Sequence, residues 1–143
     1  MNAKEIATLA HQGQFRRDGV TPYIEHSEAV ASAFEEGTLE HDAALLHDVF
    51  EDDPIFSRDP SLGRKYLLDN GIHFEVVNAV AVYLTHKKGD SYQDYIEKIV
   101  LHADDSLPAK IALADIAANL ADAPTEHQIK KYTNALKIIA KNL

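Results

Sequence analysis

Hydrophobic side chains recur every three or four positions along almost the whole chain, a spacing that is typical of amphipathic helices. Ile6 and Leu9 show this spacing near the start, and Ile24, Val30 and Phe34 repeat it further on. Glycines, prolines and capping residues divide the pattern into predicted helices. These helices run over about residues 2–12, 23–36, 60–70, 73–84, 92–102, 107–120 and 126–141, with another from residue 38 to the proline at 54.

One segment is ambiguous, because the stretch from Val76 to Val82 is rich in valine, which also favours strands. Its length and its helical neighbours favour a helix. Residues 13–22 contain two glycines, a proline and two arginines, and they predict a loop. The sequence therefore predicts an all-α fold, with one domain over residues 1–143 and a bundle of about six to eight helices.

Composition narrows the classes of function. Asp and Glu outnumber Lys and Arg by 23 to 14, and the net charge of −9 argues against a nucleic-acid partner, which would require a basic face. No apolar stretch approaches the roughly 18 residues of a membrane helix, and the first residues do not resemble a signal peptide. We therefore expect a cytoplasmic protein without a membrane partner. The oligomeric state is left open.

The segment from Ala43 to Asp53 contains the most informative polar residues. An apolar helix body leads into His47 and Asp48, and three further acids follow. On a continuous helix, His47 and Glu51 share one face, and Asp48 and Asp52 share the adjacent face. Because the chain has eight histidines and no cysteine, a metal site here would use nitrogen and oxygen ligands. The alternative interpretation is a solvated helix end followed by an acidic surface run.

Two other helices contribute candidate ligands. His26 stands early in one amphipathic helix, and Asp115 stands inside a helix that is otherwise almost wholly apolar. An ionised carboxylate on such a helix is costly to bury unless it is paired or bound to a metal. Asn119 follows Asp115 by one turn on the same face. The alternatives are a partly exposed position for Asp115 and, for His26, a histidine with satisfied hydrogen bonds in the first turn of its helix.

The order of these residues resembles that of a known family. His26, then His47 and Asp48, then Asp115 resembles the H…HD…D metal set of the HD-domain phosphohydrolases. The surrounding residues narrow the resemblance to the alarmone hydrolases, which are the hydrolase domains of bifunctional (p)ppGpp synthetase/hydrolases and the stand-alone small alarmone hydrolases.

Three segments carry this narrower resemblance. Residues 10–26 are similar to the "AHxGQxRxxGxPYxxHP" opening of those hydrolases, residues 44–52 to their "ALLHDxxED", and residues 113–119 to their "LADxxxN". The matches are collinear and span most of the chain. The sequence departs at Ser27, where the family has proline, at Ala112, where it has lysine, and at residues 116–118, where an arginine and a histidine are lost.

The resemblance implies an HD-domain helical bundle and a metal-dependent phosphohydrolase that acts on the 3′-pyrophosphate of (p)ppGpp. It implies four metal ligands, which are His26, His47, Asp48 and Asp115, and two catalytic acids, which are Glu51 and Asp52. Two imidazoles and two carboxylates suit a divalent ion with open coordination positions, above all Mn²⁺, with Zn²⁺, Fe²⁺ and Co²⁺ as alternatives.

A polyphosphate substrate also requires local cations on an acidic chain. Arg16 and Arg17 in the predicted loop are the best candidates, because guanidinium groups fit phosphate oxygens. Tyr23 would pack on the base or position the loop, and Asn119 would contact the nucleotide. The altered residues 116–118 leave a second hypothesis, a nucleotide phosphohydrolase with another phosphate-ester substrate. A third is a non-catalytic nucleotide-sensing module.

Overall fold

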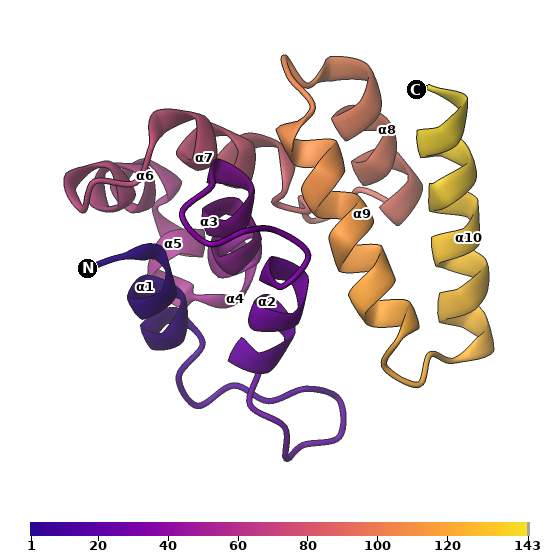
Figure 1. Cartoon of the computed structure of the whole chain (residues 1–143), viewed down its shortest axis with the longest axis horizontal. Helices are drawn as coiled ribbons and strands as arrows, with labels where there is room; N and C mark the ends of the chain where they lie inside the picture. Colours follow the sequence, from indigo (N-terminus) through magenta and orange to yellow (C-terminus); the bar gives the residue numbers. More distant parts are fainter. Residues whose placement is uncertain (143) are drawn as a thin grey trace.

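The computed structural model describes residues 1–142, and for residues 52, 54 and 55 it describes the backbone alone. The regular elements of the described chain are helical, in agreement with the predicted all-α fold (Figure 1). In chain order they are α1 (Ala3–Ala10), α2 (Ile24–Ala31), α3 (Leu39–Leu46), α4 (Val49–Asp52), α5 (Pro54–Arg58), α6 (Pro60–Asp69), α7 (Phe74–Asn78), the π-helix η1 (Ala79–Tyr83), α8 (Tyr92–His102), α9 (Leu107–Leu120) and α10 (Glu126–Lys141).

Local capping residues explain where several helices begin. The side chains of Asn2, Ser91 and Thr125 each accept a hydrogen bond from the backbone three residues later, and the residue at that position bonds back to the cap. These capping boxes satisfy backbone groups that a helix start leaves unpaired. Thr38 caps α3 in a simpler way, by accepting from the backbone N–H of His41. The predicted starts near these residues are therefore confirmed.

Helix α9 occupies a central position in the bundle. It packs against α2 and α3 on one side and against α8 and α10 on the other (Figure 1). This position explains why α9 is apolar around most of its circumference. Ile111 and Ile116 of α9 are fully buried, as are Leu46 of α3 and Ile96 of α8. A residue in the middle of α9 can therefore meet side chains from both halves of the chain.

Two predicted helices are wrong in detail. The helix predicted over residues 23–36 ends at Ala31, and turns follow it. The helix predicted from residue 38 to residue 53 is divided into α3 and α4, with His47 and Asp48 in the turn between them. Because of this division and the short α5, the described chain contains more helices than the predicted six to eight. The ambiguous valine-rich segment is helical, with its second half a π-helix.

Among the described residues, no helix has both the length and the apolar character that crossing a membrane requires.

Candidate metal centre

The four candidate metal ligands come from three separate segments of the sequence and lie close together in the structure. His26 lies on α2, His47 follows the last residue of α3, Asp48 precedes α4, and Asp115 lies near the middle of α9. Nε2 of His26 lies 2.8 Å from Oδ1 of Asp115. Nε2 of His47 lies 3.4 Å from the same oxygen and 3.0 Å from Oδ2 of Asp48. The structure therefore places the four predicted ligands next to one another.

The predicted geometry of the acidic segment is wrong, although its ligands converge. A continuous helix would place His47 and Glu51 on one face. Instead, the backbone leaves the regular helix at His47, and Asp48 adopts φ −105° and ψ 0°. The turn places the side chains of His47 and Asp48 together, since His47 Nε2 faces Asp48 Oδ2. The turn, and not the spacing along a continuous helix, therefore brings these two candidate ligands together.

The tautomer of His47 is set by a backbone carbonyl. Its Nδ1 lies 2.7 Å from the carbonyl oxygen of Ala44, which accepts hydrogen bonds only, so Nδ1 carries the proton. Nε2 is buried and has no hydrogen-bond partner among the described residues, although it faces two carboxylates. A lone pair that faces carboxylate oxygens is unfavourable unless a cation lies between them. This position is therefore built for a proton or a metal ion.

The donor set fits a divalent metal ion. His26, His47 and Asp115 each offer a ligand atom, and these atoms lie within 4.8 Å of one another. Ligands about 2.1 Å from an ion lie roughly 3 Å apart when they are at right angles, and the observed separations of 2.8 and 3.4 Å are close to that spacing. Asp48 adjoins the three through its contact with His47. Two nitrogens with carboxylate oxygens suit a borderline or hard divalent ion.

The charges in this cluster shift the protonation of its members. Burial lowers the pKa of His47, but Asp48 and Asp115 raise it by more, so that it lies well above 6.5. Burial raises the pKa of Asp48, but the charge of His47 and the hydrogen bonds from His47 and Tyr23 together outweigh burial and lower it. The pKa of Asp115 is lowered in the same way, with the hydrogen bond from His26 as the largest opposing effect. Without a metal, the cluster therefore holds a proton on His47 between ionised carboxylates.

Tyr23 contacts the same carboxylate oxygen of Asp48 that faces His47. Its hydroxyl donates a 2.6 Å hydrogen bond to Oδ2 of Asp48. Its ring packs against His11, with ring centroids 4.8 Å apart, and meets the edge of His26. His11 is buried, and its Nδ1 bonds to the side-chain oxygen of Gln14. Of the two roles expected for Tyr23, packing on a base or positioning, these contacts favour positioning.

Asn119 joins Asp115 to the predicted substrate loop. Its Nδ2 donates to Oδ1 of Asp115 at 3.2 Å, and its Oδ1 accepts from Arg16 at 3.1 Å. Arg16 also bonds to Asp122 at 3.3 Å and lies 5.6 Å from the centre of the Tyr23 ring. The loop and α9 are therefore fastened together beside the metal donors. Both ends of the Asn119 amide already have protein partners.

The loop itself is folded around a tight turn. Backbone bonds join Arg16 to Thr21 and Gly19 to Arg16, and Gly19 has the positive φ of 74° that this turn requires. Asp18 accepts from Thr21, and these bonds lower its pKa to about 2. Arg17 lies in this turn and is exposed. The loop thus holds Arg16 inward and leaves Arg17 in solvent.

A small cavity opens beside the metal donors. It has a volume of about 170 Å³, and the residues that line it are Asp48, Glu51, Leu84, His86, Tyr92, Tyr95, Asp115 and Lys131. The carboxylate of Glu51 accepts a hydrogen bond from the backbone N–H of His86, which fastens it to the segment after η1. The structure therefore places Glu51 at the same cavity as Asp48 and Asp115. The side chain of Asp52 lies outside the described part of the chain.

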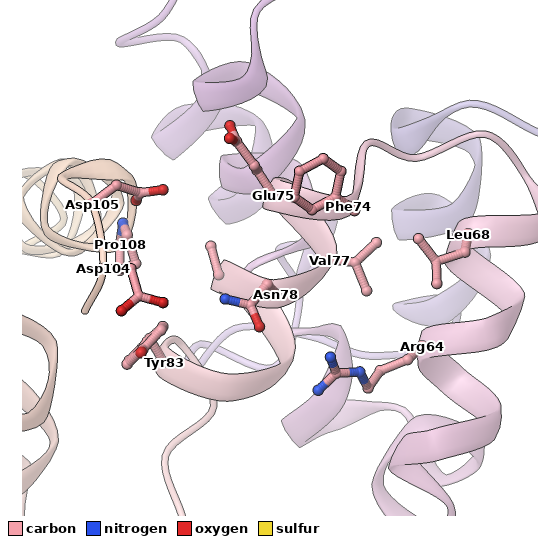
Figure 2. A pocket seen from close by; sticks show the side chains of 11 residues that line it. Arg64, Leu68, Phe74, Glu75, Val77, Asn78, Tyr83, Asp104, Asp105 and Pro108 are labelled. Atoms are coloured by element: carbon pink, nitrogen blue, oxygen red, sulfur yellow. The ribbon is translucent and has the colours of Figure 1, made fainter. Parts of the chain in front are cut away.

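Larger hollows lie elsewhere on the molecule. One of about 430 Å³ is bounded by α6, α7, η1 and the start of α9 (Figure 2). Arg64 and Leu68 lie on one wall of this hollow, and Tyr83 and Asp104 lie on the other. Another, of about 490 Å³, lies between α1 and α6. None of the four candidate metal donors lines either of these hollows, whereas Asp48 and Asp115 line the smaller cavity.

Sequence reasoning did not assign to the site two basic side chains that line the small cavity beside Asp48 and Asp115. His86 and Lys131 belong to no motif, and a single sequence offers no signal that would bring them to Asp115. Tyr92 and Tyr95 also line the cavity. Burial is the largest influence on these two phenols and raises the pKa of each. They therefore stay neutral and add no charge to the cavity.

Comparison with known proteins supports the resemblance over part of the chain. The chain is 56% identical over 52 residues to a guanosine-3′,5′-bis(diphosphate) 3′-pyrophosphohydrolase of Haemophilus influenzae, a match that covers 34% of this chain and 8% of that protein. It is 47% identical over 57 residues to the bifunctional (p)ppGpp synthase/hydrolase SpoT of Escherichia coli, which covers 38% of this chain and 8% of SpoT. A relative from Shigella flexneri matches to the same extent as SpoT.

The chain thus spans only 8% of the length of the curated relatives that it matches. No family model matches it. The resemblance to the alarmone hydrolases is confirmed for about a third of the chain, at 34–38% coverage.

Proposed function

We propose that this chain is a metal-dependent phosphohydrolase that removes the 3′-pyrophosphate of (p)ppGpp and releases GDP or GTP and pyrophosphate. The observation that carries the proposal is the convergence of two histidines and two aspartates beside a cavity that Glu51 also lines. The candidate metal donors and Glu51, which could accept a proton, therefore lie beside the same cavity. The names of the similar proteins support pyrophosphate hydrolysis as the reaction.

His26, His47, Asp48 and Asp115 would hold the ion, for which we favour Mn²⁺ over Zn²⁺, Fe²⁺ and Co²⁺. When bound, a divalent cation lowers the pKa of a nearby water and neutralises charge on the phosphate. The carbonyl of Ala44 keeps the Nε2 lone pair of His47 directed at this position. Tyr23 does the same for Asp48 through its hydroxyl.

Glu51 would accept a proton from the attacking water, and its bond from the His86 backbone would hold it in place for that step. The water oxygen bonds to the phosphorus that is attached to the ribose 3′-oxygen. The bond between that phosphorus and the 3′-oxygen breaks, and the 3′-oxygen takes up a proton. Pyrophosphate leaves with the oxygen of the water. We assign Asp52 to the same acid–base step on the resemblance alone.

Arg16 would bind phosphate oxygens from its position between Asn119 and Tyr23, and Arg17 would reach the same ligand from the exposed side of the turn. Asn119 and Tyr23 then serve the substrate by holding Arg16 and Asp48. The partner we propose is a small guanosine nucleotide. This activity would place the chain in the cytoplasm and in the stringent response.

The test is a product analysis with the Mn²⁺-loaded protein. Wild-type protein and an Asp48→Ala variant are incubated with ppGpp and with a panel of nucleoside monophosphates, and the released anions are identified. We expect pyrophosphate and GDP from ppGpp with the wild type, and neither with Asp48→Ala, because that variant loses a charge from the metal site.

Two results would reject the proposal in favour of its alternatives. Release of orthophosphate from a mononucleotide, with ppGpp intact, would indicate a phosphohydrolase with another substrate. Nucleotide binding without turnover of any phosphate ester in the panel would indicate a nucleotide-sensing module.

A further inference from the structure

One lysine of α10 lines the small cavity of about 170 Å³ beside the candidate metal donors. Lys131 of α10 lines the cavity together with Asp48, Glu51 and Asp115. Its Nζ lies 4.5 Å from the centre of the Tyr92 ring and 5.1 Å from the centre of the Tyr132 ring. Within the described part of the chain, no carboxylate lies within ion-pair distance of this Nζ. The side chain is therefore held by aromatic faces and not by an acid.

The environment of Lys131 differs from that of the cations that are held in ion pairs. Arg16 is paired with Asp122, Lys65 with Asp69, and Lys110 with Glu40. A cation above an aromatic ring is attracted by the ring, but its N–H donors are not consumed by the contact. Lys131 is half-buried, so part of its hydration is already lost. Its donors are available to an acceptor inside the cavity.

The charge around the cavity requires such a cation. Asp48, Glu51 and Asp115 all line it, and one divalent ion would not neutralise three carboxylates. A polyphosphate would add further negative charge. Lys131 is the one Lys or Arg among the lining residues that the structure describes. It is therefore the side chain that can offset this charge within the cavity itself.

The size and shape of the cavity indicate which part of a nucleotide would lie there. Its volume of about 170 Å³ is well below the roughly 300–1,000 Å³ of sites that enclose a whole small ligand. Phosphate groups fit, and the nucleoside would remain outside. Lys131 and Tyr92 also line a neighbouring hollow against α10, so Lys131 lies where the two hollows adjoin, and its Nζ is not within ion-pair distance of Asp48 or Asp115. A phosphate near Lys131 would be the one beyond the phosphate at the metal.

We propose that Lys131 binds the terminal phosphate of the 3′-pyrophosphate, the phosphate remote from the bond that breaks, and so selects pyrophosphate esters over monophosphate esters. This inference rests on the proposed function for its substrate. Lys131 does not act on the reacting atoms, and its contribution is to binding and specificity.

The experiment measures anion binding by calorimetry with Mn²⁺ in excess over protein and ligand. Inorganic pyrophosphate and orthophosphate are titrated into wild type, Lys131→Gln, Lys131→Arg and the control Lys130→Gln, which changes an exposed neighbouring lysine. We expect Lys131→Gln to weaken pyrophosphate binding by about tenfold or more, the usual effect of losing a charged hydrogen-bond donor. Orthophosphate binding should stay within about twofold of the wild type. The Arg variant should retain most of the pyrophosphate affinity, and Lys130→Gln should resemble the wild type.

Three results would overturn the inference. These are a wild type that does not bind pyrophosphate, a Lys131→Gln variant with wild-type affinity, and equal losses for both anions. With an active enzyme, Lys131→Gln should raise KM for ppGpp by more than it lowers kcat. If the wild type hydrolyses no ppGpp but binds pyrophosphate through Lys131, the proposed function fails, and the recognition of pyrophosphate by Lys131 stands without it.

Discussion

Replacement of Asn119 by alanine separates two roles for this residue. The sequence predicts a contact with the nucleotide, whereas both ends of its amide are bonded to Asp115 and Arg16 in the structure. If Asn119 positions Asp115, its loss should weaken metal binding. Removing such a supporting hydrogen bond typically lowers metal affinity by about 10–100-fold.

This loss converts into a measurable change in thermal stability. At a free metal concentration of about 100 times the wild-type Kd, binding stabilises the wild type by about 2.7 kcal/mol. At the same concentration, a 10–100-fold weaker variant gains only about 0.4–1.4 kcal/mol. For a domain of this size, the metal-induced rise in Tm should fall from about 5–11 °C to about 1–6 °C.

The assay is thermal unfolding with EDTA and with Mn²⁺, together with direct metal titration. Asn142→Ala is the matched control, because Asn142 follows the last residue of α10 and its side chain donates to the carbonyl of Ile138. An Asn119→Ala variant with wild-type metal affinity and a raised KM would refute the positioning role. That result would instead support the contact between Asn119 and the nucleotide that the sequence predicts.

Three further predictions concern the same cluster. Glu51→Gln should leave metal affinity unchanged but lower kcat by about 100-fold or more, as measured in steady-state assays, because Glu51 manages a proton and not the ion. Tyr23→Phe removes the 2.6 Å bond to Asp48 and should raise the metal Kd by about tenfold in a metal titration, whereas Tyr66→Phe should not. The pKa of His47 is raised above 6.5 by Asp48 and Asp115 against the effect of burial. Its proton therefore stabilises the metal-free protein fully below that pH, and Tm in EDTA should fall as the pH rises from about 6 to about 9. With Mn²⁺ the trend should reverse, since metal and proton compete for His47.

An unchanged kcat in Glu51→Gln would contradict the role of Glu51 in the acid–base step. A Tm in EDTA that is flat across this pH range, or that rises with pH, would contradict the protonation assigned to His47. Asp48→Asn provides the matched control, because it removes one of the charges that raise the pKa of His47 and should flatten the curve.

The sequence by itself determined most of the helices, and it predicted the four candidate metal donors that the structure brings together. Capping residues such as Asn2, Ser91 and Thr125 act on backbone groups within three residues, so local sequence is sufficient to place a helix start. The donors were found because their residue types and order match a known motif. The predicted range 1–143 for a single domain stays a prediction.

Only the tertiary structure decided how these parts meet. The turn at His47 and Asp48 replaced the predicted helix, because the Ala44 carbonyl and the packing of α3 against α9 fix the imidazole there. Asn119 changed from a nucleotide contact to a link between Asp115 and Arg16, which are separated by about a hundred positions in the chain. Lys131 reached the cavity because α10 packs beside α8 and α9. Contacts of this kind depend on long-range packing, which the local pattern of hydrophobic and polar residues does not encode.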